Sequence, residues 1–147
     1  MTDIVAALAA IRARAEGQIT TLPLKWQDET NELPDEPEPF AFVEVITDRS
    51  GFIEIGGGRG ANRHRQTGEI HAYVFAPIGR GLAYGAGLAE PVAAVFRSYR
   101  GGGISCMGAS VHPVGEGSAL VPPGLSSAAG NYACVVVIVP FYFDQTA

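Results

Sequence analysis

The residues that could support chemistry fall into small sets, and none has the spacing that its chemistry requires. Gly56–Gly60, with Arg59 among the glycines, could bind an anion through backbone N–H groups. A phosphate-binding loop, however, continues into Lys-Ser/Thr and a helix, whereas here a basic stretch and a predicted strand follow. His64, His71 and His112 lie on separate predicted elements without an i, i+4 pair, so the spacing predicts no metal site.

Candidate nucleophiles also lack a supporting pattern. Ser105-Cys106 and Gly124–Ser127 do not form the Gly-x-Ser-x-Gly sequence of a nucleophile elbow. Cys106 and Cys134 lack metal-ligand spacing, are too few for a disulfide framework, and read as small buried hydrophobic residues. We therefore expect no enzyme activity, no metal and no cofactor, and a reducing cytoplasm is the expected setting.

Charge is distributed unevenly along the chain. It has 10 basic and 15 acidic residues, and the net charge of −5 argues against sequence-specific DNA binding. The segment from Asp28 to Glu38 contains two prolines, is followed by Pro39 and has no basic residue, which predicts an exposed, extended loop. Its acidic residues are Asp28, Glu29, Glu32, Asp35, Glu36 and Glu38.

A basic cluster follows the glycine-rich stretch and consists of Arg59, Arg63, His64 and Arg65. Either charged segment alone is typical of a solvated loop. Together, one acidic and one basic protruding loop favour head-to-tail pairing between copies of the chain. Such pairing closes into a ring if the rotation between neighbours allows it.

Composition and length limit the class of protein. The 147 residues fit one domain, and 19 of them are glycine, close to twice the usual share of about 7%. No apolar run approaches the 18 or more residues of a membrane helix, and the N-terminus has no basic region typical of a secretory signal. We therefore expect a single folded domain over residues 1–147 with no membrane association.

Two helices are predicted from apolar residues at helical spacing. The first begins at Ile4, with Thr2 or Asp3 as the N-cap and Gly17 as a left-handed residue at its end. The second covers Leu82–Tyr99, contains Pro91, and ends at the glycines 101–103.

Strands are predicted between these helices and after them. Ile19–Trp26 is short and extended, and Phe40–Thr47 and Gly51–Ile55 form a hairpin around Asp48-Arg49-Ser50. Further strands cover Thr67–Ala76, Ile104–Val111 and Tyr132–Phe143, the last of these following a long loop over Pro113–Ala129. This order predicts an α+β fold, with two helices packed on one face of an antiparallel or mixed sheet.

The chain resembles the tail terminator (tail-completion) proteins of long-tailed bacteriophages. The resemblance lies in the run Arg63–Pro77 (RHRQTGEIHAYVFAP), followed by Gly79-Arg80-Gly81 and the helix to Phe96. The short N-terminal helix, Leu24-Lys25-Trp26 before a proline-rich turn, and a Gly/Pro-rich loop leading into an apolar final strand also match. The likeness spans most of the chain in order, as a diffuse pattern without an invariant signature.

The resemblance implies a subunit of a hexameric ring in the virion, at the head-proximal end of the tail tube. Such a ring stops tube polymerisation and docks the head connector. The partners of each subunit are then other copies of the chain, the tube protein and the connector. DNA passes through the lumen of the ring without specific binding. It has no catalytic residues. By position, the segments expected at subunit or tube contacts include Arg59, Arg63, His64, Arg65, Gln66, Pro122, Pro123 and Leu125.

The long acidic, proline-rich loop and the high glycine content depart from the family pattern. The resemblance therefore does not define which residues form the contacts between subunits. The acidic loop could set the charge of the lumen or pair with the basic cluster of a neighbour. Two other interpretations remain: another head–tail connector or tube component of similar build, and a small cytoplasmic α+β enzyme or ligand-binding domain.

Overall fold

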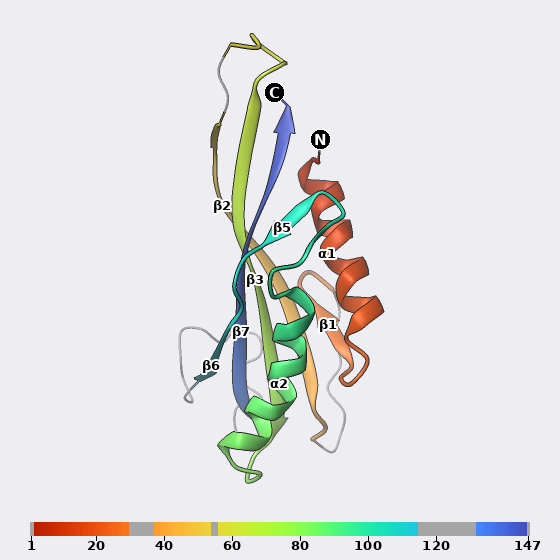
Figure 1. The fold of residues 1–147 in the computed structure, drawn as a ribbon. Helices are drawn as coiled ribbons and strands as arrows, with labels where there is room; N and C mark the ends of the chain where they lie inside the picture. The colour runs from red at the N-terminus through yellow and green to blue at the C-terminus, as the bar shows by residue number, and fades with distance from the viewer. Residues whose placement is uncertain (1, 30–36, 54–55, 115–131, 147) are drawn as a thin grey trace.

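Three long antiparallel strands form the centre of the computed structural model (Figure 1). The structure describes residues 2–29, 37–53, 56–114 and 132–146. The long strands are β2 (Phe40–Phe52), β3 (Arg63–Pro77) and β7 (Tyr132–Thr146). The shorter strands are β1 (Leu24–Trp26), β4 (Arg100–Gly101), β5 (Ile104–Cys106) and β6 (Ser110–Val114), and the helices are α1 (Ile4–Gln18) and α2 (Leu82–Phe96).

The described strands form one mixed sheet in the order β1-β2-β3-β7-β5-β4, and β6 pairs with β7 next to β5. β1 runs parallel to β2, and every other pairing is antiparallel. β7, the last strand in the sequence, therefore lies inside the sheet. The α+β fold with a mixed sheet confirms the sequence-based prediction of the fold class.

The two faces of the sheet carry separate apolar clusters, because successive side chains of a strand point to opposite faces. Ile70 and Val74 of β3 lie on the face that both helices cover (Figure 1). Tyr73 and Phe75 lie on the opposite face, where the Phe75 ring stacks on Phe40 at 4.9 Å between ring centroids. The helices contribute mainly small and medium-sized buried residues to the first cluster: Ala7, Ile11 and Ala15 from α1, and Ala89, Val92, Ala93 and Phe96 from α2.

The helix ends agree in part with the prediction. Asp3 caps α1, its carboxylate accepting a hydrogen bond from the Ala6 N–H at 2.8 Å. The prediction that Gly17 ends this helix in a left-handed conformation was wrong, because α1 continues to Gln18 and Ile19 forms its C-cap. At Gly85 in α2, an added Cβ would lie 3.1 Å from Val135, so glycine there allows the helix to approach β7 closely.

Four further predictions about element boundaries were wrong. Asp48-Arg49-Ser50 is not a hairpin turn, because β2 continues through it and accommodates one extra residue as a register shift between Thr47 and Ser50. The basic run at 63–66 is not a loop but the first part of β3. The predicted strand Ile104–Val111 is divided into β5 and β6, and α2 ends at Phe96, ahead of the glycines 101–103.

Candidate functional site

The outer part of the β2–β3 hairpin projects beyond the N-terminus of α1 (Figure 1). We call it the arm, and define it as residues 46–53 and 56–68. β1 pairs with β2 only from Ala41 to Val43, so none of the described strands pairs with the outer edge of β2 on the arm. The arm also exposes Ile46, Phe52 and Ile53, which are 44%, 61% and 43% accessible. Exposed apolar side chains beside an unpaired strand edge are features of a surface that binds another protein chain.

Gly68 determines the packing at the base of the arm. A Cβ atom at this position would lie 2.6 Å from the Ile46 carbonyl oxygen and 2.9 Å from Cε1 of Phe141, so only glycine fits without a shift. An open groove of about 530 Å³ lies at Gly68. It is lined by apolar side chains, among them Ile46, Met107, Pro140 and Phe141, and by the carboxylates of Asp48 and Glu69.

Two of the predicted basic residues bind a carboxylate of the same chain. The Arg65 guanidinium donates hydrogen bonds of 2.8 and 3.1 Å to Asp144, and Arg63 donates one of 2.9 Å to the same carboxylate. The hydrogen bond from Arg65 is the largest of the effects that lower the pKa of Asp144 to about 2, with Arg63 adding to it. Arg65 also lies over the Tyr142 ring, 4.0 Å from its centroid.

This contact limits the predicted pairing of the basic cluster with a neighbouring copy. Both guanidinium groups are engaged with this carboxylate of their own chain, so Arg63 and Arg65 offer a partner less charge than the sequence suggests. Sequence reasoning missed Asp144. The only signal that could have found it is the register of β3 on β7, in which Arg65 pairs with Asp144.

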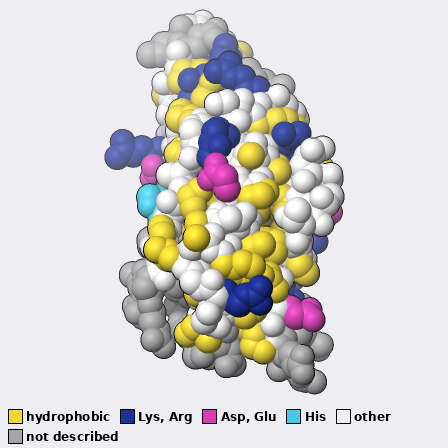
Figure 2. All heavy atoms as spheres, turned by 60° about the horizontal axis from the view of Figure 1, so that its bottom comes forward, with side chains coloured by type: hydrophobic (Ala, Val, Ile, Leu, Met, Phe, Trp, Pro, Cys, Tyr) yellow, Lys and Arg dark blue, Asp and Glu magenta, His cyan; other side chains and the backbone are white. Residues whose placement is uncertain are grey.

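The other residues predicted for this surface lie at different points of the arm. Arg59 is exposed in the connection between β2 and β3. His64 pairs with Phe52 at the outer end of the ladder, with ring centroids 4.2 Å apart, and Gln66 pairs with Ser50. Figure 2 shows Lys and Arg side chains gathered near the upper end of one face of the molecule. The remaining predicted contacts, Pro122, Pro123 and Leu125, lie outside the described residues.

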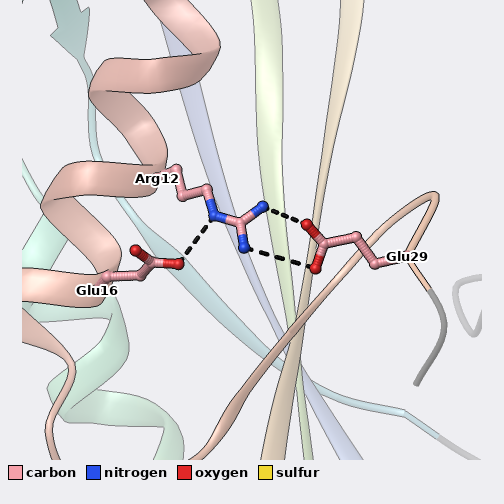
Figure 3. A network of polar contacts seen from close by, with 3 residues as sticks. All are labelled: Arg12, Glu16 and Glu29. Carbon is pink, nitrogen blue, oxygen red and sulfur yellow. Dashed lines mark hydrogen bonds and ion pairs between the residues drawn. The ribbon is translucent and has the colours of Figure 1, made fainter.

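The described part of the predicted acidic loop is attached to α1. Arg12 donates a hydrogen bond of 2.8 Å to Glu16 and also binds both carboxylate oxygens of Glu29 (Figure 3). These contacts, with Glu29 first, raise the pKa of Arg12. Asp28 and Glu38 are exposed, and Glu32, Asp35 and Glu36 lie outside the described residues.

A row of polar side chains that sequence reasoning missed crosses the face of the sheet opposite the helices. Tyr73 donates its hydroxyl proton to Glu44 at 2.7 Å, so its oxygen accepts from Nδ1 of the buried His71 at 3.2 Å. His71 Nε2 then faces Glu69 at 3.6 Å. Burial, together with the bond to Glu44, raises the pKa of Tyr73.

The remaining sequence candidates are dispersed. Nε2 of His112 lies 2.8 Å from Oγ of Ser110, and both residues are on β6, whereas His64 and His71 are on β3. The described residues contain no group of three or more potential metal ligands. Cys106 pairs with Phe141 on the helix-covered face, whereas Cys134 lies on the opposite face, and both are free thiols. Burial raises the pKa of Cys106 to about 11 and that of Cys134 to about 12.

Within the described chain, neither helix is long and apolar enough to cross a membrane.

Comparison with known proteins identifies the fold. No protein-family model matches this chain, and no curated protein does. Eight chains of solved structures match. One of these, a protein whose name states no activity or partner, covers 100% of this chain and 99% of its own length, with a TM-score of 0.61 and 18% sequence identity. At this identity the likeness shows a shared fold, and function has to be inferred from the surface of the molecule.

Proposed function

We propose that this chain is the tail terminator of a long-tailed bacteriophage. Copies of it would form a hexameric ring at the head-proximal end of the tail tube in the virion. The ring would stop tube polymerisation and provide the docking surface for the head connector. The sequence resemblance from Arg63 to Phe96 supports this proposal, and the α+β fold is compatible with it.

The observation that carries the proposal is the arm. A strand edge that none of the described strands covers, and exposed apolar side chains such as Phe52 and Ile53, are costly on an isolated protein, because they invite pairing with other chains. Assembly into a ring would cover them. A small enzyme would instead require a convergent set of polar groups in a pocket. Besides its apolar residues, the groove at Gly68 is lined by Thr47, Asp48, Thr67 and Glu69, and no histidine, cysteine or serine is among its lining residues.

The termination mechanism follows from complementary surfaces. A tube grows when each ring presents edges or loops that the next ring extends. A terminator that matches the tube on one side, and presents no such surface on the other, leaves the next tube subunit nothing to bind. Genomic DNA would pass through the lumen, and a neutral or acidic wall would avoid binding its phosphates. The segment 28–38 is the part of the chain that we assign to this wall or to an arginine of the neighbouring copy.

The decisive experiment uses a phage that carries this gene. Deleting the gene should give overlong tails detached from heads, and supplying the gene from a plasmid should restore tails of normal length. Tails that are absent altogether would identify a tube protein instead. For the purified chain, light scattering over a range of protein concentrations should show a hexamer, and a monomer at every concentration would contradict the ring.

A further inference from the structure

We propose that the tip of the arm of one copy, centred on Phe52, inserts into the groove at Gly68 of the next copy. This inference rests on the self-assembly in the proposed function and specifies the contact that joins neighbouring subunits. Each chain would thus contribute one apolar projection and one apolar recess to the ring.

The tip presents a large apolar side chain on a defined backbone. Phe52 is 61% exposed, although it is the last residue of β2 paired with β3. Its ring packs against the His64 imidazole, with 4.2 Å between centroids, which restricts its orientation. Ile53 follows it and is also exposed. Large, rigid aromatic side chains that fill a pocket are the usual anchors of protein interfaces.

The groove is a suitable recess for such an anchor. Its volume of about 530 Å³ is more than one aromatic side chain occupies, so the Phe52 ring can enter it. Ile46 and Met107 in its lining are 44% and 50% exposed, which is apolar surface that insertion would cover.

The charge of the groove is complementary to one residue next to the tip. The lining of the groove includes Asp48 and Glu69 and, among the described residues, no basic residue. The connection next to the tip carries the exposed Arg59, and Glu54 follows Ile53 in the sequence. Insertion would bring Arg59 to an acidic groove, which favours this orientation over groove-to-groove contact.

The two surfaces must belong to different copies. Phe52 pairs with His64 on β3, whereas the groove lies beside Gly68 of the same strand. Four residues of strand separate these positions by roughly 13 Å along the same ribbon, so the tip does not reach the groove of its own chain. A contact between two different surfaces of identical subunits is heterologous, and such contacts generate closed rings or open filaments.

A disulfide cross-link tests the contact directly. Phe52→Cys and Met107→Cys are made as separate full-length variants, mixed, and treated with a mild oxidant such as diamide. We expect a covalent dimer in the mixture and much less in either variant alone. The native Cys106 and Cys134 are buried, so they should not compete. The matched control is Leu82→Cys mixed with Met107→Cys, because Leu82 is 68% exposed but begins α2, which lies towards the end of the molecule opposite the arm (Figure 1).

Substitutions provide an independent measurement. Phe52→Ala should weaken self-association about tenfold, whereas Leu82→Ala should leave it unchanged. Asp48→Arg should also weaken it, and the double variant Asp48→Arg/Arg59→Asp should recover part of the loss. Circular dichroism checks that each variant is folded, which we expect because all of these side chains are exposed.

The outcomes separate the two proposals. A hexamer that forms normally with Phe52→Ala, and in which Phe52→Cys and Met107→Cys do not cross-link, would overturn the contact and leave the proposed function standing. Equal cross-linking by Leu82→Cys would overturn it as well. Phe52→Cys that cross-links to the tube protein, and not to a second copy, would assign the tip to the tube. A chain that is monomeric at every concentration would contradict both proposals.

Discussion

Arg65 and Asp144 face each other across β3 and β7 and share two hydrogen bonds, of 2.8 and 3.1 Å. The pair joins the outer part of the arm to the last strand of the chain, three residues beyond Gly68 along β3. Thr2 reinforces the same point, since its N–H donates to the Asp144 carbonyl oxygen at 3.0 Å. The outer part of the arm is therefore fixed from two directions, by side chains and by the segment that leads into α1.

The Asp144 carboxylate should make the stability of the protein depend on acid pH. Its pKa of about 2 lies below the ordinary value of 3.8, so its contribution is present above about pH 4 and is lost as the pH falls towards 2. Asp144→Asn should lower the free energy of unfolding at pH 7 by about 1 kcal/mol, because the ion pairs are near the surface. Thermal melts between pH 2 and pH 5 should show a shallower acid dependence for this variant than for the wild type. Parallel curves would contradict the assignment.

Glycine at position 68 should be essential for stability. Gly68→Ala places a methyl group against the Ile46 carbonyl and the Phe141 ring, which should cost roughly 1–3 kcal/mol in the free energy of unfolding. Gly51→Ala is the matched control, because it lies on the neighbouring strand with no atom within 4 Å of its would-be Cβ. Urea denaturation of both variants measures the difference, and equal midpoints would show that the base of the arm is not tightly packed.

Tyr73 should resist ionisation. Its raised pKa means that the folded protein keeps the hydroxyl proton above pH 10, where the unfolded chain releases it. Stability should therefore fall as the pH rises above 10, and Tyr73→Phe should lack this part of the decrease. At pH 7 the same variant should lose about 1–2 kcal/mol, because Glu44 and His71 lose a hydrogen-bond partner. Ultraviolet titration of tyrosinate absorbance, compared with equilibrium unfolding, checks both effects.

The native thiols should be nearly unreactive in the folded protein. With a pKa of about 11 against an ordinary 9.0, Cys106 has about a hundredfold less thiolate at pH 8 than a free thiol, and Cys134 has still less. Labelling with Ellman's reagent should be slow in buffer and rapid in guanidinium chloride. Met107→Cys, at an exposed position, should add one fast-reacting thiol. Fast labelling of the wild-type chain would mean that β5 or β7 opens readily.

Local patterns in the sequence predicted the elements but not every boundary. Helical spacing identified α1 and α2, and the apolar run at 132–143 identified β7, because burial on one or both faces leaves a clear signature over more than ten residues. Asp48-Arg49-Ser50 has the composition of a turn, yet it lies within β2. A bulge accepts the same polar residues as a turn, and the sequence does not distinguish the two.

The candidate site depended on pairings between distant parts of the chain. The basic cluster was visible in the sequence, but its partner Asp144 lies 79 positions from Arg65, and only the strand register brings them together. The groove depends on Gly68, Met107 and Phe141 in the same way, from three separate elements. The exposure of Phe52 could not be predicted from the sequence either, because an apolar residue in a strand is ordinarily expected to face the core.

The position of β7 has a consequence for the order of events in the cell. β7 pairs with β3, β5 and β6, yet it is translated after all of them. While a ribosome is still making the chain, β3 lacks the neighbour that covers its whole length, and the Arg65–Asp144 contact does not exist. We therefore expect nascent chains to be unable to dock with finished subunits until residues 132–146 have emerged, so that translation itself would keep incomplete molecules out of the assembly.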